Sequence, residues 1–144
     1  AGSRVKVRFR MASDRSIGGQ GWYIDDVRIY ACANDRDKPS GSIVIDGGNE
    51  TTAGPRVSLG LTWDDPTTWV TKVRLSGSPK LNDAGTVLRR AINMAPRANV
   101  AWDFADTTFG GSGGPGERWV YAQVRDAAGN WSDVFADRIL WTEP

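Results

Sequence analysis

The sequence predicts an all-β protein whose main domain is a seven-stranded sandwich of two sheets. First, apolar and polar residues alternate over short segments, which is typical of strands with one buried face. Second, the 17 Gly and 7 Pro residues gather between these segments, where turns are expected. Third, the segments recur at nearly even spacing over residues 42–144, and this regularity is typical of a β-sandwich.

The expected strands follow one another along the chain in a regular order. Two of them precede the sandwich, at 5–11 and 22–30. The other strands are expected at 42–46, 56–63, 69–76, 86–94, 99–104, 117–126 and 132–141. In the sixth of these nine segments, Val87, Leu88, Ala91 and Ile92 also fit one stripe of a helix. We favour a strand there because every neighbouring element is one.

Alternation also predicts which side chains point into the sandwich. Trp69 and Thr71 are expected to face inward together with a larger apolar set. That set is Val57, Leu59, Leu61, Val73, Leu75, Val100, Trp102, Phe104, Val120, Ala122, Val124 and Ile139. At about 1.5–3 kcal/mol per large apolar side chain, such a core can offset chain entropy without a disulfide.

The domain organisation is predicted to be a remnant, a linker and one complete domain. Residues 1–32 are too few to bury a core of their own, and the polar run 33–41 reads as a linker before the sandwich at 42–144. The sequence starts without Met and within a strand-like segment, so we expect it to be a piece of a larger protein.

Composition excludes several function classes. The chain has no His and a single Cys, which removes imidazole bases, Ser-His and Cys-His dyads and ordinary zinc sites. The formal net charge of +1 argues against a nucleic-acid partner, and no apolar run is long enough for a membrane span. We therefore expect a protein that is not an enzyme.

Two stretches carry a resemblance to known families. Val120–Ser132, with its turn Ala127-Ala128-Gly129-Asn130, resembles the penultimate strand and hairpin of bacterial immunoglobulin-like (Ig-like) and fibronectin-type modules. Ile45-Asp46-Gly47-Gly48, followed by Thr51-Thr52, resembles their opening. Such modules occur in large secreted and cell-surface bacterial proteins as spacers, adhesive units or enzyme appendages. The resemblance therefore implies an extracellular or cell-surface location.

The N-terminal segment carries the second resemblance. Phe9 and the stretch from Gly21 to Val27 resemble the last strands of jelly-roll domains, found in carbohydrate-binding proteins and secreted bacterial peptidases. In several such families an Asp on the last strand binds structural calcium, which implies this role for Asp25 or Asp26 in the intact parent protein. Successive strand residues point to opposite faces, so at most one of the two serves a given site.

The best candidate binding surface is aromatic. Trp119 and Tyr121 lie two residues apart on the face expected to point away from the core, and Lys72 and Arg74 point outward from a neighbouring segment. Together they could bind a polysaccharide or a protein. The alternative is that the cationic stems cover the rings and the face packs on a neighbouring module.

The remaining acids are expected to stabilise turns. Asp64, Asp65 and Asp126 each precede a turn, where an Asp side chain accepts backbone N–H bonds without a metal. We therefore expect no cofactor in the sandwich, and a calcium chelator should leave its melting temperature unchanged.

Three functions fit these expectations. The first is a non-catalytic Ig-like module for binding, adhesion or spacing, in contact with neighbouring domains of its parent chain. The second is the C-terminal accessory region of a secreted hydrolase, with a peptidase as the first choice, and the third is a carbohydrate-binding module. The apolar faces of residues 1–32 lack a core, so we expect this segment either to stay disordered or to find a substitute partner, which is the sandwich of the same chain or the same segment of a second chain. If the segment is ordered, we favour self-association, with Cys32 able to form an intermolecular disulfide.

Overall fold

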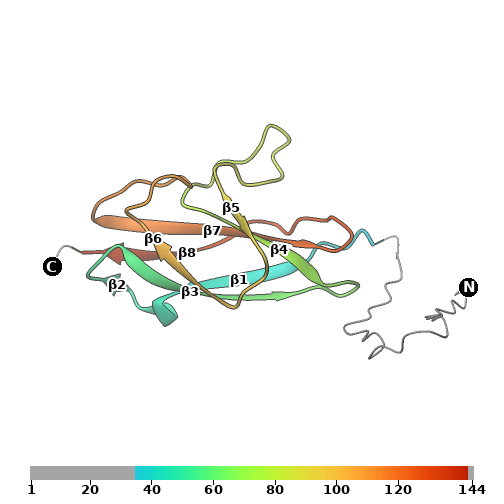
Figure 1. The fold of residues 1–144 in the computed structure, drawn as a ribbon, viewed down its shortest axis with the longest axis horizontal. Coiled ribbons are helices and arrows are strands. Elements are labelled where there is room, and N and C mark those ends of the chain that lie inside the picture. The colour runs from blue at the N-terminus through green and yellow to red at the C-terminus, as the bar shows by residue number, and fades with distance from the viewer. Residues whose placement is uncertain (1–34, 143–144) are drawn as a thin grey trace, which may run out of the picture. The chain divides into compact units, whose positions relative to one another are not determined.

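The computed structural model describes residues 35–142 (Figure 1). The strands expected before residue 32, the calcium ligands Asp25 and Asp26, and the thiol of Cys32 lie outside the described residues. Within residues 35–142, the chain forms two β-sheets that face each other. No helix in this range is long and apolar enough to span a membrane.

The described part contains eight strands and one short 3-10 turn. The strands are β1 (Ser40–Ile45), β2 (Thr51–Thr52), β3 (Arg56–Asp64), β4 (Val70–Ser76), β5 (Ile92–Met94), β6 (Asn99–Asp103), β7 (Gly116–Asp126) and β8 (Phe135–Trp141). The turn η1 (Asp46–Gly48) follows β1. Each segment predicted from 42 onward overlaps one of these strands, and the two-residue β2 is additional.

The sheets have a topology typical of Ig-like sandwiches. One sheet has three strands in the order β1-β3-β6, and the other has five in the order β2-β8-β7-β4-β5. All neighbours pair antiparallel except β2 and β8, which pair parallel. In Figure 1, β1 and β3 run along the lower side of the view and β7 lies above them. The predicted all-β, Ig-like class is therefore confirmed.

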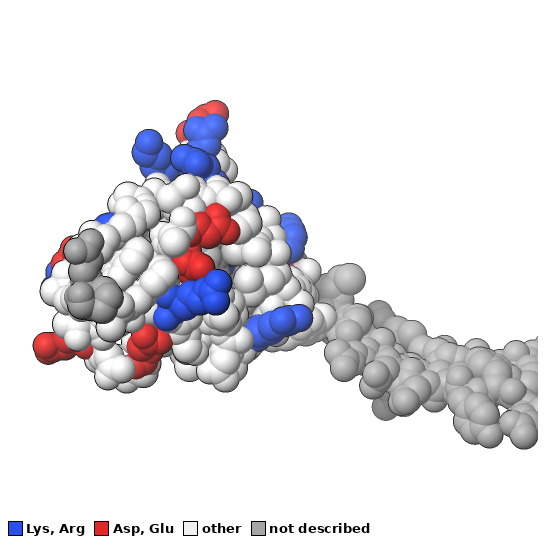
Figure 2. Space-filling view, turned by 60° about the vertical axis from the view of Figure 1, so that its left-hand side comes forward, with Lys and Arg blue, Asp and Glu red and all other residues white. Residues whose placement is uncertain are grey.

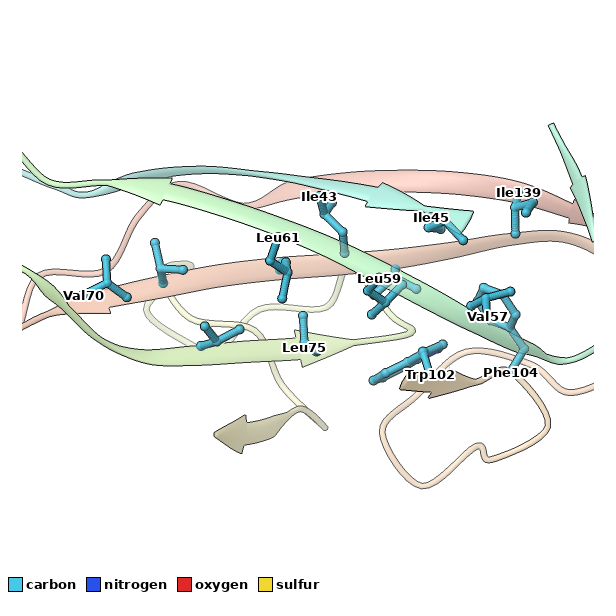
Figure 3. Close-up of a cluster of buried hydrophobic side chains, with 14 residues drawn as sticks. Ile43, Ile45, Val57, Leu59, Leu61, Val70, Leu75, Trp102, Phe104 and Ile139 are labelled. Carbon is cyan, nitrogen blue, oxygen red and sulfur yellow. The ribbon is translucent and has the colours of Figure 1, made fainter. Parts of the chain in front are cut away.

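The core lies between the two sheets, as Figure 3 shows. Every predicted inward side chain of the larger apolar set is buried there, except Val100, which is partly buried against it. Ile43 and Ile45 of β1, together with Val70, complete the cluster. The alternation of apolar and polar residues predicted this core well, because successive side chains of a strand point to opposite faces of the sheet.

The predicted orientation at the start of β4 is wrong. Trp69 is 42% exposed, whereas Val70, expected outward, is only 8% exposed. The register between β4 and β7 shifts between Val70 and Lys72, so one extra residue reverses the alternation there. Thr71 consequently points outward, and its hydroxyl lies within hydrogen-bond distance of the main-chain oxygens of Arg125 and Asp126, at 3.2 and 3.0 Å.

The segment between β4 and β5 is the largest departure from a simple sandwich. It rises away from the sheet at the top of Figure 1. The strand expected at 86–94 is confined to Ile92–Met94, and Leu88 is buried in the preceding loop. The buried side chain of Gln123 on β7 holds this loop through hydrogen bonds with the main chain of Leu88 and Thr86.

Candidate functional site

Trp119 and Tyr121 form an aromatic pair on the outer face of the five-stranded sheet. Both project from β7, opposite the buried Val120 and Ala122. Their ring centroids lie 6.0 Å apart with an interplanar angle of 16°, so the two rings are nearly parallel. Trp119 remains 36% exposed, which leaves ring surface available to a ligand.

Charged side chains hold the Trp119 ring in place. The indole Nε1–H donates to Glu117 Oε1 at 2.8 Å, and Arg138 of β8 donates to Glu117 Oε2 at 2.6 Å. The Arg138 guanidinium also lies over the indole, 5.6 Å from its centroid. The bond from Trp119, followed by the positive charge and hydrogen bond of Arg138, lowers the pKa of Glu117 below its ordinary value.

The pKa of Tyr121 is shifted upward, opposite to that of Glu117. Burial raises the pKa of its phenol, and the nearby Glu117 carboxylate adds to the rise. The phenol is therefore neutral at physiological pH and can form hydrogen bonds beside the ring of Trp119.

On the face that Figure 2 shows, acidic and basic side chains are interspersed, and neither sign of charge forms a separate patch.

A shallow hollow lies beside the aromatic pair. It has a volume of about 130 Å³, and its wall includes Trp102, Phe104, Asp106, Glu117, Trp119 and Tyr121. Main chain of the glycine-rich segment closes one side, because Gly77 and Gly110 approach each other too closely for side chains. Hydrogen bonds from Thr108 lower the pKa of Asp106. The hollow thus joins apolar ring surface to two ionised carboxylates.

Lys72 and Arg74 lie farther along the sheet than the sequence suggested. On β4, Ser76 pairs with Tyr121, whereas Arg74 pairs with Gln123 and Lys72 with Arg125. The Arg74 guanidinium stacks over Trp131, 5.4 Å from the ring centroid. Arg138 of β8, which no sequence pattern singled out, is the cation that accompanies Trp119. Cross-strand register decides this, and register is not visible in one strand alone.

Two of the three acids predicted to stabilise turns, Asp65 and Asp126, accept main-chain hydrogen bonds in their turns. The Asp65 carboxylate accepts hydrogen bonds from the main-chain N–H groups of Thr67 and Thr68. Asp126 accepts from Gly129 and Asn130 in the same way, and Gly129 has the predicted positive φ, at 106°. Asp64 lies at the end of β3 and is exposed.

The structure also brings together acids that the sequence separates. Carboxylate oxygens of Asp35, Asp65 and Asp126 all lie within 4.8 Å of one another. Asp35 belongs to the predicted linker, and its main-chain oxygen accepts a hydrogen bond from the Asn130 amide. No local motif marks Asp35, because its neighbours come from loops distant in sequence.

Comparison with known proteins adds one structural neighbour. The structure resembles the PKD1 domain of Vibrio anguillarum Epp with a TM-score of 0.49 and 13% sequence identity. The alignment covers 76% of this chain and 100% of that domain. No family model matches the sequence, and no curated protein matches it. The Ig-like β-sandwich assignment is carried by the sheet topology described above.

Proposed function

We propose that this chain is a non-catalytic Ig-like module of a larger secreted or cell-surface bacterial protein, and that it serves as a binding unit. The observation that carries the proposal is the nearly parallel, partly exposed Trp119–Tyr121 pair. The exposed part of the Trp119 ring projects from a strand and is held by its neighbours, so little conformational entropy is lost when a ligand covers it.

The groups around the pair favour a polysaccharide ligand. A sugar ring presents C–H groups on its face and hydroxyls at its rim. The aromatic faces suit the C–H groups, and the carboxylates of Glu117 and Asp106 can accept hydrogen bonds from hydroxyls. Arg138 supplies donors at the edge of the same surface. A surface meant for an apolar protein partner would carry fewer charges at its centre.

The residue inventory supports a role without catalysis. The sequence has no His, and its only Cys is Cys32. The two carboxyl groups at the hollow have lowered pKa values and so are ionised at neutral pH, which does not suit a general acid. The sequence resemblance to modules of secreted and cell-surface bacterial proteins supports the location and the role within a larger chain.

Titration of the full chain with polysaccharides tests this proposal. A glycan array identifies ligands, and quenching or a shift of intrinsic Trp fluorescence then reports binding in solution. Trp119→Ala should reduce affinity at least tenfold. Trp69→Ala is the matched control, because Trp69 is similarly exposed. It lies near the other end of the sheet, about 20–25 Å away at 3.4 Å per strand residue.

Two outcomes would contradict the polysaccharide proposal. One is an absence of response across the array, and the other is equal loss of affinity in both variants. The first outcome would leave the module as a spacer or a protein-binding unit.

A further inference from the structure

We propose that Asp35, Asp65 and Asp126 bind a calcium ion that fixes the segment before β1 to the end of the sandwich. Asp35 comes from the segment before β1, which we call the entry segment. Asp65 lies in the β3–β4 loop, and Asp126 lies at the end of β7. This site is separate from the Trp119 surface and does not depend on the binding function proposed above.

An unsatisfied oxygen is the first reason for a ligand. Asp65 Oδ1 accepts hydrogen bonds from the turn, but Asp65 Oδ2 is shielded from solvent and has no hydrogen-bond partner. A buried carboxylate oxygen without a partner is costly, and nearly all such atoms in folded proteins are satisfied. A cation bound at Oδ2 would remove this cost.

The hydroxyl of Thr68 does not relieve the unsatisfied oxygen, because it lies against other carboxylate oxygens of the group. Thr68 Oγ1 lies 3.0 Å from Asp65 Oδ1 and 3.1 Å from Asp35 Oδ2. A hydroxyl carries one proton, so it can donate to only one of these two oxygens at a time. Main-chain N–H groups already serve Asp65 Oδ1 and Asp35 Oδ1, and Asn130 serves both oxygens of Asp126. If the Thr68 hydroxyl donates to Asp35 Oδ2, Asp65 Oδ2 is the one carboxylate oxygen of the group that is left without a donor.

The charge of the group points the same way. Asp126 is 2% exposed, and one of its oxygens lies within 4.8 Å of one oxygen each of Asp35 and Asp65. Within residues 35–142, the ion pairs involve other acids, namely Asp133, Asp103, Asp83 and Glu117. Like charges this close repel each other, especially where one of them is shielded from water. A divalent cation at the centre would convert this repulsion into attraction.

The donor set and its spacing fit calcium. Oxygens bound to Ca²⁺ lie about 2.3–2.6 Å from the ion, so two ligands of one ion can be up to about 5 Å apart. The observed limit of 4.8 Å meets this condition. Carboxylate oxygens are hard ligands, and Ca²⁺ accepts irregular geometry with water completing the shell, whereas Mg²⁺ requires a nearly ideal octahedron.

Calcium would act on the entry segment through Asp35. That residue already contacts both loops, because Thr68 Oγ1 donates to its carboxylate and Asn130 Nδ2 donates to its main-chain oxygen. A bound ion would lock these contacts and stiffen the chain that enters β1. This inference departs from the sequence-based expectation that the sandwich needs no metal, because the sequence did not place Asp35 beside the two turn acids.

The experiment compares the full chain in chelator and in calcium. Isothermal titration calorimetry should show one site with a Kd of about 10⁻⁴–10⁻³ M, the range of extracellular calcium modules. At a calcium concentration one hundred times Kd, the melting temperature should rise by about 10 °C. Magnesium at the same concentration should give a much smaller rise.

Asp65→Asn tests whether the effect arises at this site. The variant should lose the calorimetric signal and the calcium-dependent rise in melting temperature. In chelator it should be at least as stable as the parent chain, because it removes one of three repelling charges. A purely structural role for Asp65 would instead lower stability equally with and without calcium. Asp83→Asn is the matched control, since Asp83 is an exposed acid outside the group, and it should retain the full response.

Three results would overturn the proposal. These are no heat of binding with an unchanged melting temperature in calcium, a full calcium response in Asp65→Asn, and an equal response to magnesium. Circular dichroism of Asp65→Asn in chelator verifies that the variant is folded, so loss of response is attributable to the missing ligand.

Discussion

Single buried polar side chains hold the irregular parts of this sandwich. Gln123 is 1% exposed although it lies on the outward side of β7. Its oxygen accepts from Leu88 N at 2.8 Å, and its Nε2 donates to the oxygens of Thr86 and Ser132 at 2.8 and 3.0 Å. One side chain thus attaches two loops to the sheet.

Gln123→Leu should destabilise the protein by about 2–4 kcal/mol. The substitution nearly keeps the volume but leaves three main-chain groups without their partner, and two of these bonds, to Leu88 and Ser132, are buried. The cost is about 1–3 kcal/mol for each group that cannot reach water. Urea denaturation followed by far-UV circular dichroism measures the change. Ser58→Val on the exposed face of β3 is the control and should change stability by less than about 0.5 kcal/mol. A cost of Gln123→Leu below about 1 kcal/mol would show that the loops are held by other contacts.

The Glu117–Trp119 bond should be visible in a pH titration. Because the pKa of Glu117 is lowered, its ionised form is favoured in the folded state. Its contribution to stability is therefore present above the ordinary glutamate pKa and is lost as the pH falls through the lowered value. We expect the Trp119 indole N–H resonance to shift with a midpoint below the ordinary glutamate range in ¹H–¹⁵N NMR spectra.

Two variants verify that assignment. Trp119→Phe identifies the resonance by its disappearance, and Glu117→Gln should abolish the pH-dependent shift. A midpoint at or above the ordinary glutamate value would mean that the hydrogen bond does not persist in solution.

At the scale of elements, the segment before β7 requires glycine for two different reasons, a positive φ and close packing. Gly110 has a φ of +90°, and a Cβ there would lie 2.8 Å from Ser78 Cβ. Gly114 has a similar φ of +98°, but a Cβ would meet nothing within 4 Å. The pair therefore separates backbone strain from steric exclusion.

Gly110→Ala should cost clearly more stability than Gly114→Ala. Positive φ alone costs an L-residue about 1–2 kcal/mol, which is the expected loss for Gly114→Ala. Gly110→Ala adds a clash against Ser78, so its loss should be about 3 kcal/mol or more. Thermal unfolding of both variants measures the difference. Equal losses would show that the contact between the Gly110 and Ser78 segments relaxes without cost.

Elements and site residues differ in how far the sequence could predict them. Leu59, Leu75 and Val124 were predictable because burial on one face requires only alternation. Trp69 and Val70 were not, since the bulge depends on how β4 pairs with Arg125 and Asp126 of another strand. The turn roles of Asp65 and Asp126 are local and could be predicted. Asp35 joins them only through the topology, which a single sequence does not reveal.

At the scale of the whole molecule, a side-chain bond links the two sheets beside the apolar core. Ile45 of β1 donates its main-chain N–H to Asp137 of β8 at 2.8 Å. The core cluster itself draws on both sheets. We therefore expect residues 40–141 to unfold in one cooperative step.

Association of whole chains is the final prediction, and it concerns residues 1–32. Val5, Val7 and Phe9 alternate with charged residues, and Trp22 and Ile24 begin a second apolar stretch. A pair of strands alone is marginal in water, so a segment of this kind gains stability by pairing with another. We propose that the partner is the same segment of a second chain, joined by a disulfide between the two Cys32 residues.

Light scattering after size exclusion measures this association. In oxidising buffer we expect twice the chain mass of 15.7 kDa, because the Cys32 disulfide makes the pair covalent. With reductant, the mass should depend on concentration, since edge-to-edge pairing then acts without the covalent bond. Cys32→Ser should behave in oxidising buffer as the parent chain does in reductant. The decisive contrary result is a monomer at every concentration in which residues 1–32 are protected from hydrogen exchange, because the segment would then be packed within its own chain.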